Sequence, residues 1–261
     1  MDETLFHRDG DWLVPTDLTR SPWGPEAQHG GPPLALTVRE AESVMPEGMG
    51  VWRVAAEILR PIPHRPLQAG AALVRPGRRV ALIEVELTDS DGPVVLARIW
   101  AIRDREPLDY PEPPDPQPET PPAPGTLDDS PFAFAAYTWF GDSLDTRVVS
   151  GAIDGLGRAT AWFRLRVPVV AGEEPTPEQR LATMVDSGNG ISWGLPFGEW
   201  LFINSDVTTY LLRRPAGEWF AMEAVSHYDR GGRGIAETRL FDEQGYLGRS
   251  HQALFVDRFV R

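Results

Sequence analysis

Alternating apolar and polar positions predict that most of the chain forms β-strands. In the first half, turn-forming pairs such as Asp91-Gly92 separate four such stretches, the order expected of an antiparallel meander. A helix is expected just before them, over about residues 34–43, because apolar residues recur there at helical spacing. The four predicted strands span residues 51–62, 67–75, 79–89 and 94–103.

The second half repeats this order of elements, with a helix set among strands. Its predicted strands span residues 132–140, 157–167, 202–213, 218–228, 233–242 and 246–256. The helix lies between the second and the third of these strands. Both halves therefore have the pattern of one helix followed by a long antiparallel sheet, the composition of an α+β layer.

The second helix carries unusually complete boundary signals. Thr176 is the expected N-cap, Pro177 suits the first helical position, and Gln179 stands where a capping box needs it. Gly188 is expected to end the helix. Asp186 projects from the flank opposite the apolar stripe, near the negative end of the helix dipole, where a carboxylate costs about 0.3–1 kcal/mol. A carboxylate in such a position either faces solvent or is stabilised by other groups of the protein.

Two short sequence matches indicate a tandem duplication. Ile-Leu-Arg-Pro ends at Pro61 and Leu-Arg-Arg-Pro ends at Pro215, an offset of 154 residues. Ile-Arg-Asp-Arg ends at Arg105 and Phe-Val-Asp-Arg ends at Arg258, an offset of 153 residues. Two matches at almost one offset predict that the halves are repeats of one unit.

A proline-rich stretch divides the chain between the repeats. Proline occurs nine times between residues 107 and 124, in an acidic context typical of an extended, semi-rigid spacer. The predicted organisation is an N-terminal repeat over residues 1–106, a linker over residues 107–131 and a C-terminal repeat over residues 132–261.

Composition narrows the range of possible functions. A hydrophobic content of 41% and nine Trp can build a substantial core, and the net charge of −13 argues against a nucleic-acid partner. The absence of Cys excludes disulfides and thiol chemistry. The N-terminus has no secretory signal pattern, and no apolar run is long enough to cross a bilayer, so we expect a cytoplasmic protein without a membrane partner.

The repeat order resembles the double hotdog acyl-CoA thioesterases of the thioesterase II (TesB-like) type. The resemblance rests on the entry to the first helix at His29-Gly30-Gly31, on the Leu-Arg-Arg-Pro strand end and on the repeated element order, and it covers nearly the whole chain. It implies an α+β fold, a tandem (double) hotdog with two antiparallel sheets that each wrap a central helix. The two sheets of such a protein join.

The resemblance also implies a catalytic trio in the second half. Carried over residue by residue, the family's Asp falls on Asp186, its hydroxyl residue on Ser205 and its amide on Gln252. At the repeat offsets, the first-half counterparts of Ser205 and Gln252 are the apolar Val51 and Ile99. Only the second half is therefore expected to hold a polar site.

The position of the hydroxyl residue stays open at this point. Ser205 lies in the sequence Asn204-Ser205-Asp206, which is also typical of a turn or a strand end. A register slip of one residue would put Asn204 or Asp206 beside the site instead. Gln252 alternates onto a face with apolar residues, so its amide needs a hydrogen-bond partner.

Such a trio suits thioester hydrolysis, which needs a positioned water, a base and donors for the developing oxyanion. Asp186 would be the base or would orient the water, with Ser205 and Gln252 holding the same water. The oxyanion donors are left open between the backbone near Gly188 and that near Gly30 and Gly31. Further substrate-binding candidates are His29 at the entrance and Trp193 as a pocket wall.

The leading hypothesis is a cytoplasmic hydrolase that cleaves a fatty acyl-CoA, with no cofactor and no metal. The alternative is a non-catalytic acyl-CoA or lipid binder that retains the pocket. A hotdog hydratase is disfavoured because no Asp and His pair on a helix and a loop is found in the sequence. The family analogy also allows two such chains to pair into a homodimer of double hotdogs.

Overall fold

The chain folds around one large antiparallel sheet. A computed structural model describes residues 3–109, 111, 120–128, 135–151, 153 and 155–259. Within these residues, twelve strands form the sheet, and β12 (Trp200–Asn204) pairs only with β16. In spatial order the others are β6 (Gln68–Arg75), β7 (Val80–Asp89), β8 (Gly92–Arg103), β5 (Met49–Ile58), β13 (Asp206–Leu211), β16 (Gly245–Arg258), β15 (Arg233–Asp242), β14 (Trp219–Asp229), β11 (Ala159–Leu165), β10 (Leu144–Ser150) and β9 (Thr126–Asp128).

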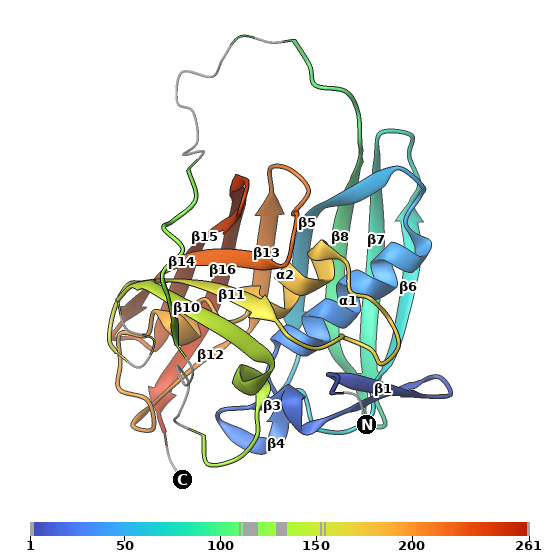
Figure 1. The fold of residues 1–261 in the computed structure, drawn as a ribbon. Helices are drawn as coiled ribbons and strands as arrows, with labels where there is room; N and C mark the ends of the chain where they lie inside the picture. The colour runs from blue at the N-terminus through green and yellow to red at the C-terminus, as the bar shows by residue number, and fades with distance from the viewer. Residues whose placement is uncertain are drawn as a thin grey trace.

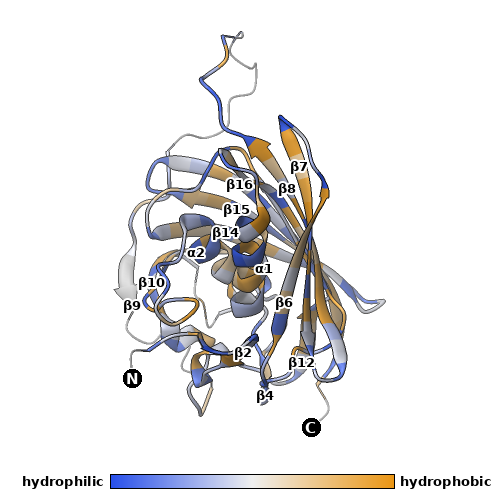
Figure 2. Ribbon diagram, turned by 90° about the vertical axis from the view of Figure 1, so that its right-hand side faces the viewer, coloured by the Kyte–Doolittle hydropathy of each residue, from blue (hydrophilic) through white to orange (hydrophobic). Residues whose placement is uncertain are grey.

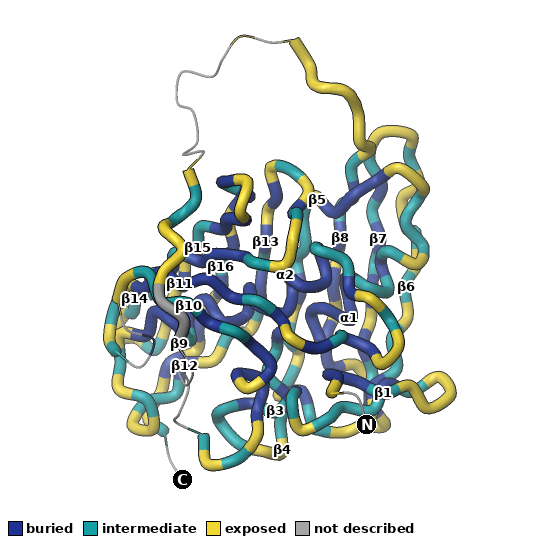
Figure 3. The backbone as a smooth tube through the Cα atoms, viewed as in Figure 1, coloured by how far each residue is buried: buried dark blue, intermediate teal, exposed yellow. Residues whose placement is uncertain are grey.

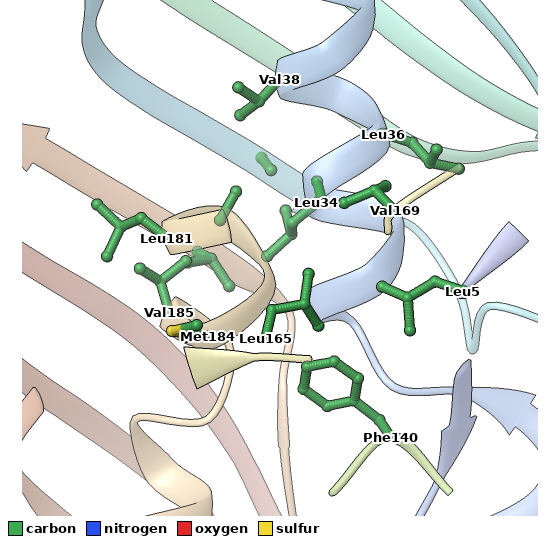
Figure 4. Close-up of a cluster of buried hydrophobic side chains, with 14 of the residues drawn as sticks. Leu5, Leu34, Leu36, Val38, Phe140, Leu165, Val169, Leu181, Met184 and Val185 are labelled. Carbon is green, nitrogen blue, oxygen red and sulfur yellow. The ribbon is translucent and has the colours of Figure 1, made fainter. Parts of the chain in front are cut away.

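Two α-helices lie side by side within the curve of this sheet (Figures 1 and 2). These are α1 (Gly31–Val44) and α2 (Pro177–Val185), and both were predicted from the sequence. Apolar side chains from the two helices and the surrounding strands form the main core, including Leu34, Leu181 and Met184 (Figure 4). The structure is thus predominantly sheet with two buried helices, as expected. No helix within the described residues is long and apolar enough to span a membrane.

The two sheets expected from the repeats are continuous with each other. They join where β5 pairs with β13 at the centre of the sheet. In this pair Ala55 faces Thr208 and Val54 faces Thr209, so each residue faces a position about one repeat offset away in the chain. Outward from the centre, β8, β7 and β6 on one side match β16, β15 and β14 on the other. The order and the register have the form of a two-fold arrangement of repeats.

Buried ion pairs repeat with the strands, a feature that the sequence analysis missed. Arg60 donates to Asp89 at 2.5 Å, and Arg213 donates to both carboxylate oxygens of Asp242 at 2.5 and 2.7 Å. Both carboxylates are fully buried. The two arginines are 153 residues apart in the chain, as are the two aspartates. An unpaired buried carboxylate is costly, so in each half of the chain an arginine compensates the buried aspartate.

The N-terminal segment forms two hairpins that were not predicted. The strands β1 (Phe6–Asp9) and β2 (Trp12–Pro15) pair, as do β3 (Arg20–Ser21) and β4 (Gly24–Gln28). A short 3₁₀-helix, Asp17–Thr19, lies between the hairpins. The backbone amide of Phe6 donates to Val169 at 2.9 Å, so the start of the chain is fixed to the second half.

Two predicted elements differ from the structure. The strand expected over residues 132–140 is not formed in its described part, because residues 135–139 are irregular and a 3₁₀-helix spans Phe140–Ser143. The strand expected over residues 202–213 is broken at Ser205, a bend between β12 and β13. Residues 132–134 lie outside the described residues.

The predicted linker is more structured at its end than expected. Its described beginning, residues 107–109, is exposed and continues the segment that leaves β8 (Figure 3). Its end is tied to the protein, since Trp162 donates to the carbonyl of Ala123 at 2.9 Å and β9 pairs with β10. Residues 110, 112–119 and 129–131 of the predicted linker lie outside the described residues.

Candidate active site

The candidate site is built around the carboxylate of Asp186, the C-cap residue of α2. Thr176 caps the start of this helix as predicted, accepting a hydrogen bond from the Gln179 amide at 3.1 Å. Asp186 itself is 4% exposed, so it does not face bulk solvent. Its Oδ1 accepts a hydrogen bond from Asn204 Nδ2, and its Oδ2 lies 3.0 Å from His29 Nδ1. Both carboxylate oxygens are therefore held by side chains.

His29 lies in the loop before α1 and stacks on Phe140, with ring centroids 4.7 Å apart. Burial lowers the pKa of His29 below its ordinary value, and the nearby Asp186 carboxylate opposes this in part. The imidazole is therefore neutral at neutral pH. Its Nδ1 also lies 3.1 Å from the Gly31 amide, and one ring nitrogen cannot donate and accept at once. The tautomer with a proton on Nδ1 can donate it to Asp186.

The glycines at the start of α1 allow the two helices to touch. A Cβ on Gly30 would lie 2.8 Å from all three atoms of the Asp186 carboxyl group, and a Cβ on Gly31 would overlap the carbonyl of Thr183. Only glycine fits such an approach. Because the positive end of α1 lies against Asp186, it offsets the unfavourable position of this carboxylate at the negative end of α2.

Gln252 holds the turn that carries Asp186. Its Nε2 donates to the backbone carbonyl of Asp186 at 2.9 Å, and its Oε1 accepts from the Asn189 amide at 3.0 Å. The side chain is 2% exposed, and a Cβ on Gly188 would lie 2.8 Å from its Oε1. The partner that the sequence analysis required for this amide is thus the backbone at the end of α2.

The residue next to Asp186 on the neighbouring strand is Asn204. Ser205 lies in the exposed bend that follows, and its amide donates to the carbonyl of Ala253 at 3.1 Å. The sequence analysis named Asn204 as the alternative to Ser205, and the structure places Asn204 on the carboxylate and Ser205 at the rim beside it.

These residues border a cavity of about 370 Å³ between the two halves. Its polar wall includes His29, Gly30, Asp186, Asn204 and Ser205. The rest of the lining is mostly apolar and contains several rings, including Trp23, Trp139, Phe140, Trp193, Phe197 and Phe202. Three of the predicted residues lie behind this wall and do not line the cavity: Gly31, Gly188 and Gln252.

Sequence reasoning missed two features of the site. It did not predict the contact between His29 and Asp186, because this contact depends on how the start of α1 packs against the end of α2. It did not find the roles of Trp23, Phe197 and Phe202 in the cavity wall. A signal for Phe202 was present, since Phe202 and Asn204 are two residues apart on one strand and so share a face.

Models of two protein-family domains match this chain. A model of the acyl-CoA thioesterase N-terminal domain matches residues 19–102, and a model of the C-terminal domain matches residues 109–256. The chain belongs to the acyl-CoA thioesterase family. Its enzymatic class is therefore thioester hydrolase, with acyl-CoA as the substrate.

Solved structures show the same fold at low sequence identity. An acyl-CoA thioesterase II from Mycobacterium marinum is 17% identical, with a TM-score of 0.66 over 89% of this chain and 90% of that one. A tesB protein from Mycobacterium avium subsp. paratuberculosis is 17% identical, with a TM-score of 0.65 over 97% and 96% of the two chains. A hot dog fold protein of unknown function from Alicyclobacillus acidocaldarius is also 17% identical, with a TM-score of 0.70 over 100% and 97%. No curated protein matches this chain significantly.

Proposed function

We propose that this acyl-CoA thioesterase is a double hotdog that hydrolyses its substrate in the cavity between the repeats, with Asp186 as the base. The observation that carries the proposal is the buried Asp186 carboxylate, which borders the cavity while Asn204 and His29 hold its two oxygens. A carboxylate fixed in this way is positioned to accept a proton from a water beside the thioester.

The double hotdog architecture is supported by the arrangement of the sheet. The repeats would span residues 1–106 and 132–261, joined by the proline-rich residues 107–131. The β5–β13 pairing and the matching strand order on either side of it have the symmetry of two such units. The repeated buried pairs Arg60–Asp89 and Arg213–Asp242 support the same division.

The reaction follows from the residues around the carboxylate. A water attacks the thioester carbonyl carbon while Asp186 accepts its proton. The carbon–sulfur bond then breaks, and the sulfur of CoA leaves as a thiol by taking up the proton from Asp186, which returns to its carboxylate form. The backbone amide of Gly30, at the positive end of α1, is the donor that we assign to the developing oxyanion. This sequence of steps needs no cofactor.

The other predicted residues take supporting roles in this proposal. Gln252 positions Asp186 through the backbone of the helix end, and Asn204 orients the carboxylate directly. Ser205 is left at the cavity rim, where its hydroxyl can contact the water or the thioester. A fatty acyl group, a cytoplasmic location and a homodimer of such chains remain predictions from the sequence.

Replacing Asp186 with Asn tests the mechanism. We expect Asp186→Asn to lower kcat for acyl-CoA hydrolysis by at least about a hundredfold, because the base is lost while the shape is kept. Release of free thiol measures the rate, and circular dichroism checks the fold. Asp229→Asn in an exposed hairpin is the matched control and should retain wild-type activity. Unchanged turnover in Asp186→Asn would refute Asp186 as the base.

The non-catalytic alternative predicts a different result. A protein that only binds acyl-CoA would show saturable binding and no thiol release from the wild type across a panel of acyl-CoA esters. Binding without turnover by the wild type would therefore favour this alternative.

One observation favours a second candidate reaction, the hydration of an enoyl-CoA. A hydratase is disfavoured from the sequence alone because no pair of Asp and His on a helix and a loop can be recognised there. The structure provides such a pair, since Asp186 ends α2 and His29 lies in the loop before α1. Loss of the enoyl absorbance on incubation with crotonyl-CoA would support hydration, and an unchanged absorbance would exclude this substrate.

A further inference from the structure

The apolar wall of the cavity is made by rings that pack against one another. Trp23 lies 4.6 Å from Phe197 and 5.0 Å from Phe202 between ring centroids, and Trp193 lies 5.2 Å from Phe197. The Trp23–Phe202 and Trp193–Phe197 pairs are edge-to-face. Together Trp23, Trp193, Phe197 and Phe202 form what we call the ring wall, and all four line the cavity.

The ring wall begins close to the reacting end of the cavity. Phe202 and Asn204 point from the same face of β12, because side chains alternate along a strand. Two residues of a strand span about 7 Å, so the backbone positions of Phe202 and Asn204 lie only about that far apart. Asn204 is the residue that bonds to Asp186. An acyl group whose carbonyl lies beside Asp186 therefore meets rings within a few bonds.

A second aromatic group borders the same space. Phe140 is stacked on His29, and Trp139 lies next to it with its ring centroid 6.4 Å from that of His29. Phe140 and Trp139 are 1% and 5% exposed, so both are fixed in the core. The space for the acyl group thus has rigid rings from both the ring wall and this second group.

The cavity can hold either a ring or an alkyl chain, and conformational freedom favours the more compact group. The cavity volume of about 370 Å³ lies near the lower end of the roughly 300–1,000 Å³ typical of ligand pockets. A flat ring fits such a space and loses little conformational freedom on binding, whereas a long unbranched chain must order many rotatable bonds.

We propose that the preferred substrates carry an aromatic acyl group, joined to CoA through a carbonyl one or two bonds from the ring. This inference rests on the proposed function, names its substrate class and replaces the fatty acyl group that the sequence led us to expect. The edges and faces of the ring wall offer an aryl ring the offset and edge-to-face contacts that aromatic pairs prefer. An alkyl chain in the same place gains only the burial of its surface.

A panel of thioesters tests the preference in the full-length protein. The substrates are benzoyl-, phenylacetyl-, hexanoyl-, decanoyl- and palmitoyl-CoA, and release of free thiol is measured. We expect kcat/KM for the better aryl substrate to exceed that for every straight-chain substrate by about tenfold or more. Equal or faster cleavage of a straight-chain substrate overturns the inference and leaves the proposed hydrolysis intact.

A binding measurement tests the aromatic preference separately from the proposed hydrolysis. If no thioester in the panel is cleaved, the proposed function fails, and calorimetry with two stable thioethers then decides the inference. S-phenethyl-CoA should bind about tenfold more tightly than S-hexyl-CoA. Equal affinities overturn the aromatic preference.

A pair of tryptophan variants assigns the preference to the ring wall. Trp23 is only half-buried, so Trp23→Leu removes a ring from the wall at modest cost to the fold. We expect it to lower kcat/KM for phenylacetyl-CoA about fivefold and to change that for hexanoyl-CoA less than about twofold. Trp219→Leu is the matched control, because this half-buried Trp on β14 packs with Trp162 and Phe241 in a separate cluster. Equal losses for both substrates in Trp23→Leu overturn the assignment.

Discussion

Among single residues, Asp186 shows how a carboxylate can be kept at the wrong end of a helix. The end of α2 disfavours a negative charge, and burial removes the compensation of water. The structure supplies three replacements: the amide of Asn204, the ring of His29 and the positive end of α1 at Gly30. Two of these replacements, His29 and the start of α1, come from the first half of the chain, so the surroundings of the carboxylate are complete only once the two halves are assembled.

Neighbouring residues Asn204 and Ser205 give a direct test of this arrangement. Asn204→Ala should lower kcat about a hundredfold, because the carboxylate loses the donor that orients it toward the water. Ser205→Ala should lower kcat less than about fivefold, since Ser205 lies at the exposed rim. Steady-state kinetics with one acyl-CoA measure both variants. A larger loss in Ser205→Ala would show that the serine hydroxyl holds the water.

His29 should make the folded protein sensitive to acid. Burial holds its pKa below the ordinary value of 6.5 that it regains on unfolding, so at mildly acidic pH the unfolded chain binds a proton that the folded chain does not. This contribution to stability is complete above about pH 6.5 and is lost as the pH falls through the folded pKa. Urea denaturation at several pH values between 7.5 and 5 measures it.

The matched variants are His29→Gln and His227→Gln, the second in an exposed part of β14. The fall in the free energy of unfolding between pH 7.5 and 5 should be smaller in His29→Gln than in the wild type, because glutamine does not titrate. His227→Gln should follow the wild type. An unchanged pH dependence in His29→Gln would contradict this account.

For whole elements, the sequence was most informative where local chemistry decides the structure. The start of α2 was predicted because Thr176 and Pro177 act within one turn of the helix, whereas its end lies at Val185, before the Gly188 that was expected to end it. The break between β12 and β13 was missed because the bend at Ser205 depends on its pairing with Ala253 of β16. For the same reason the placement of Asn204 on Asp186 was left open, since a one-residue change along a strand exchanges its faces.

Among the contacts between elements, we expect the contact between α1 and α2 to be the most sensitive to mutation. Gly31→Ala places a Cβ against the carbonyl of Thr183, so the helices must separate. We expect the free energy of unfolding to fall by at least about 2 kcal/mol, the cost of overpacking a fixed contact. Gly24→Ala is the control, because a Cβ there meets nothing within 4 Å, and it should change stability by less than about 0.5 kcal/mol. Urea denaturation measures both, and equal stabilities would refute the close contact.

At the scale of the whole molecule, α1 and α2 meet at both of their ends, and the two meeting points differ in their chemistry. Where α1 begins and α2 ends, the cavity lies open to a substrate. Where α1 ends and α2 begins, polar side chains bond to one another, with Glu42 accepting from Thr176 at 2.8 Å and from Gln179 at 2.6 Å. Arg214 closes this end further through Asp104, at 2.7 and 2.9 Å. One end of the helix pair thus borders the cavity, and the other holds the two halves together through polar contacts.

Because the halves share one sheet and pack their helices together, the molecule should unfold as a unit. Ile83→Ala on β7 lies in the first half and is fully buried, so it should lower the free energy of unfolding by about 2–4 kcal/mol. We expect tryptophan fluorescence and far-UV circular dichroism to give one coincident transition, shifted by the same amount for both signals. Five of the nine Trp lie after residue 131, so fluorescence also reports on the half that does not carry the mutation. A transition that splits, with only one part shifted by Ile83→Ala, would show instead that the repeats unfold independently and that the β5–β13 junction contributes little to their coupling.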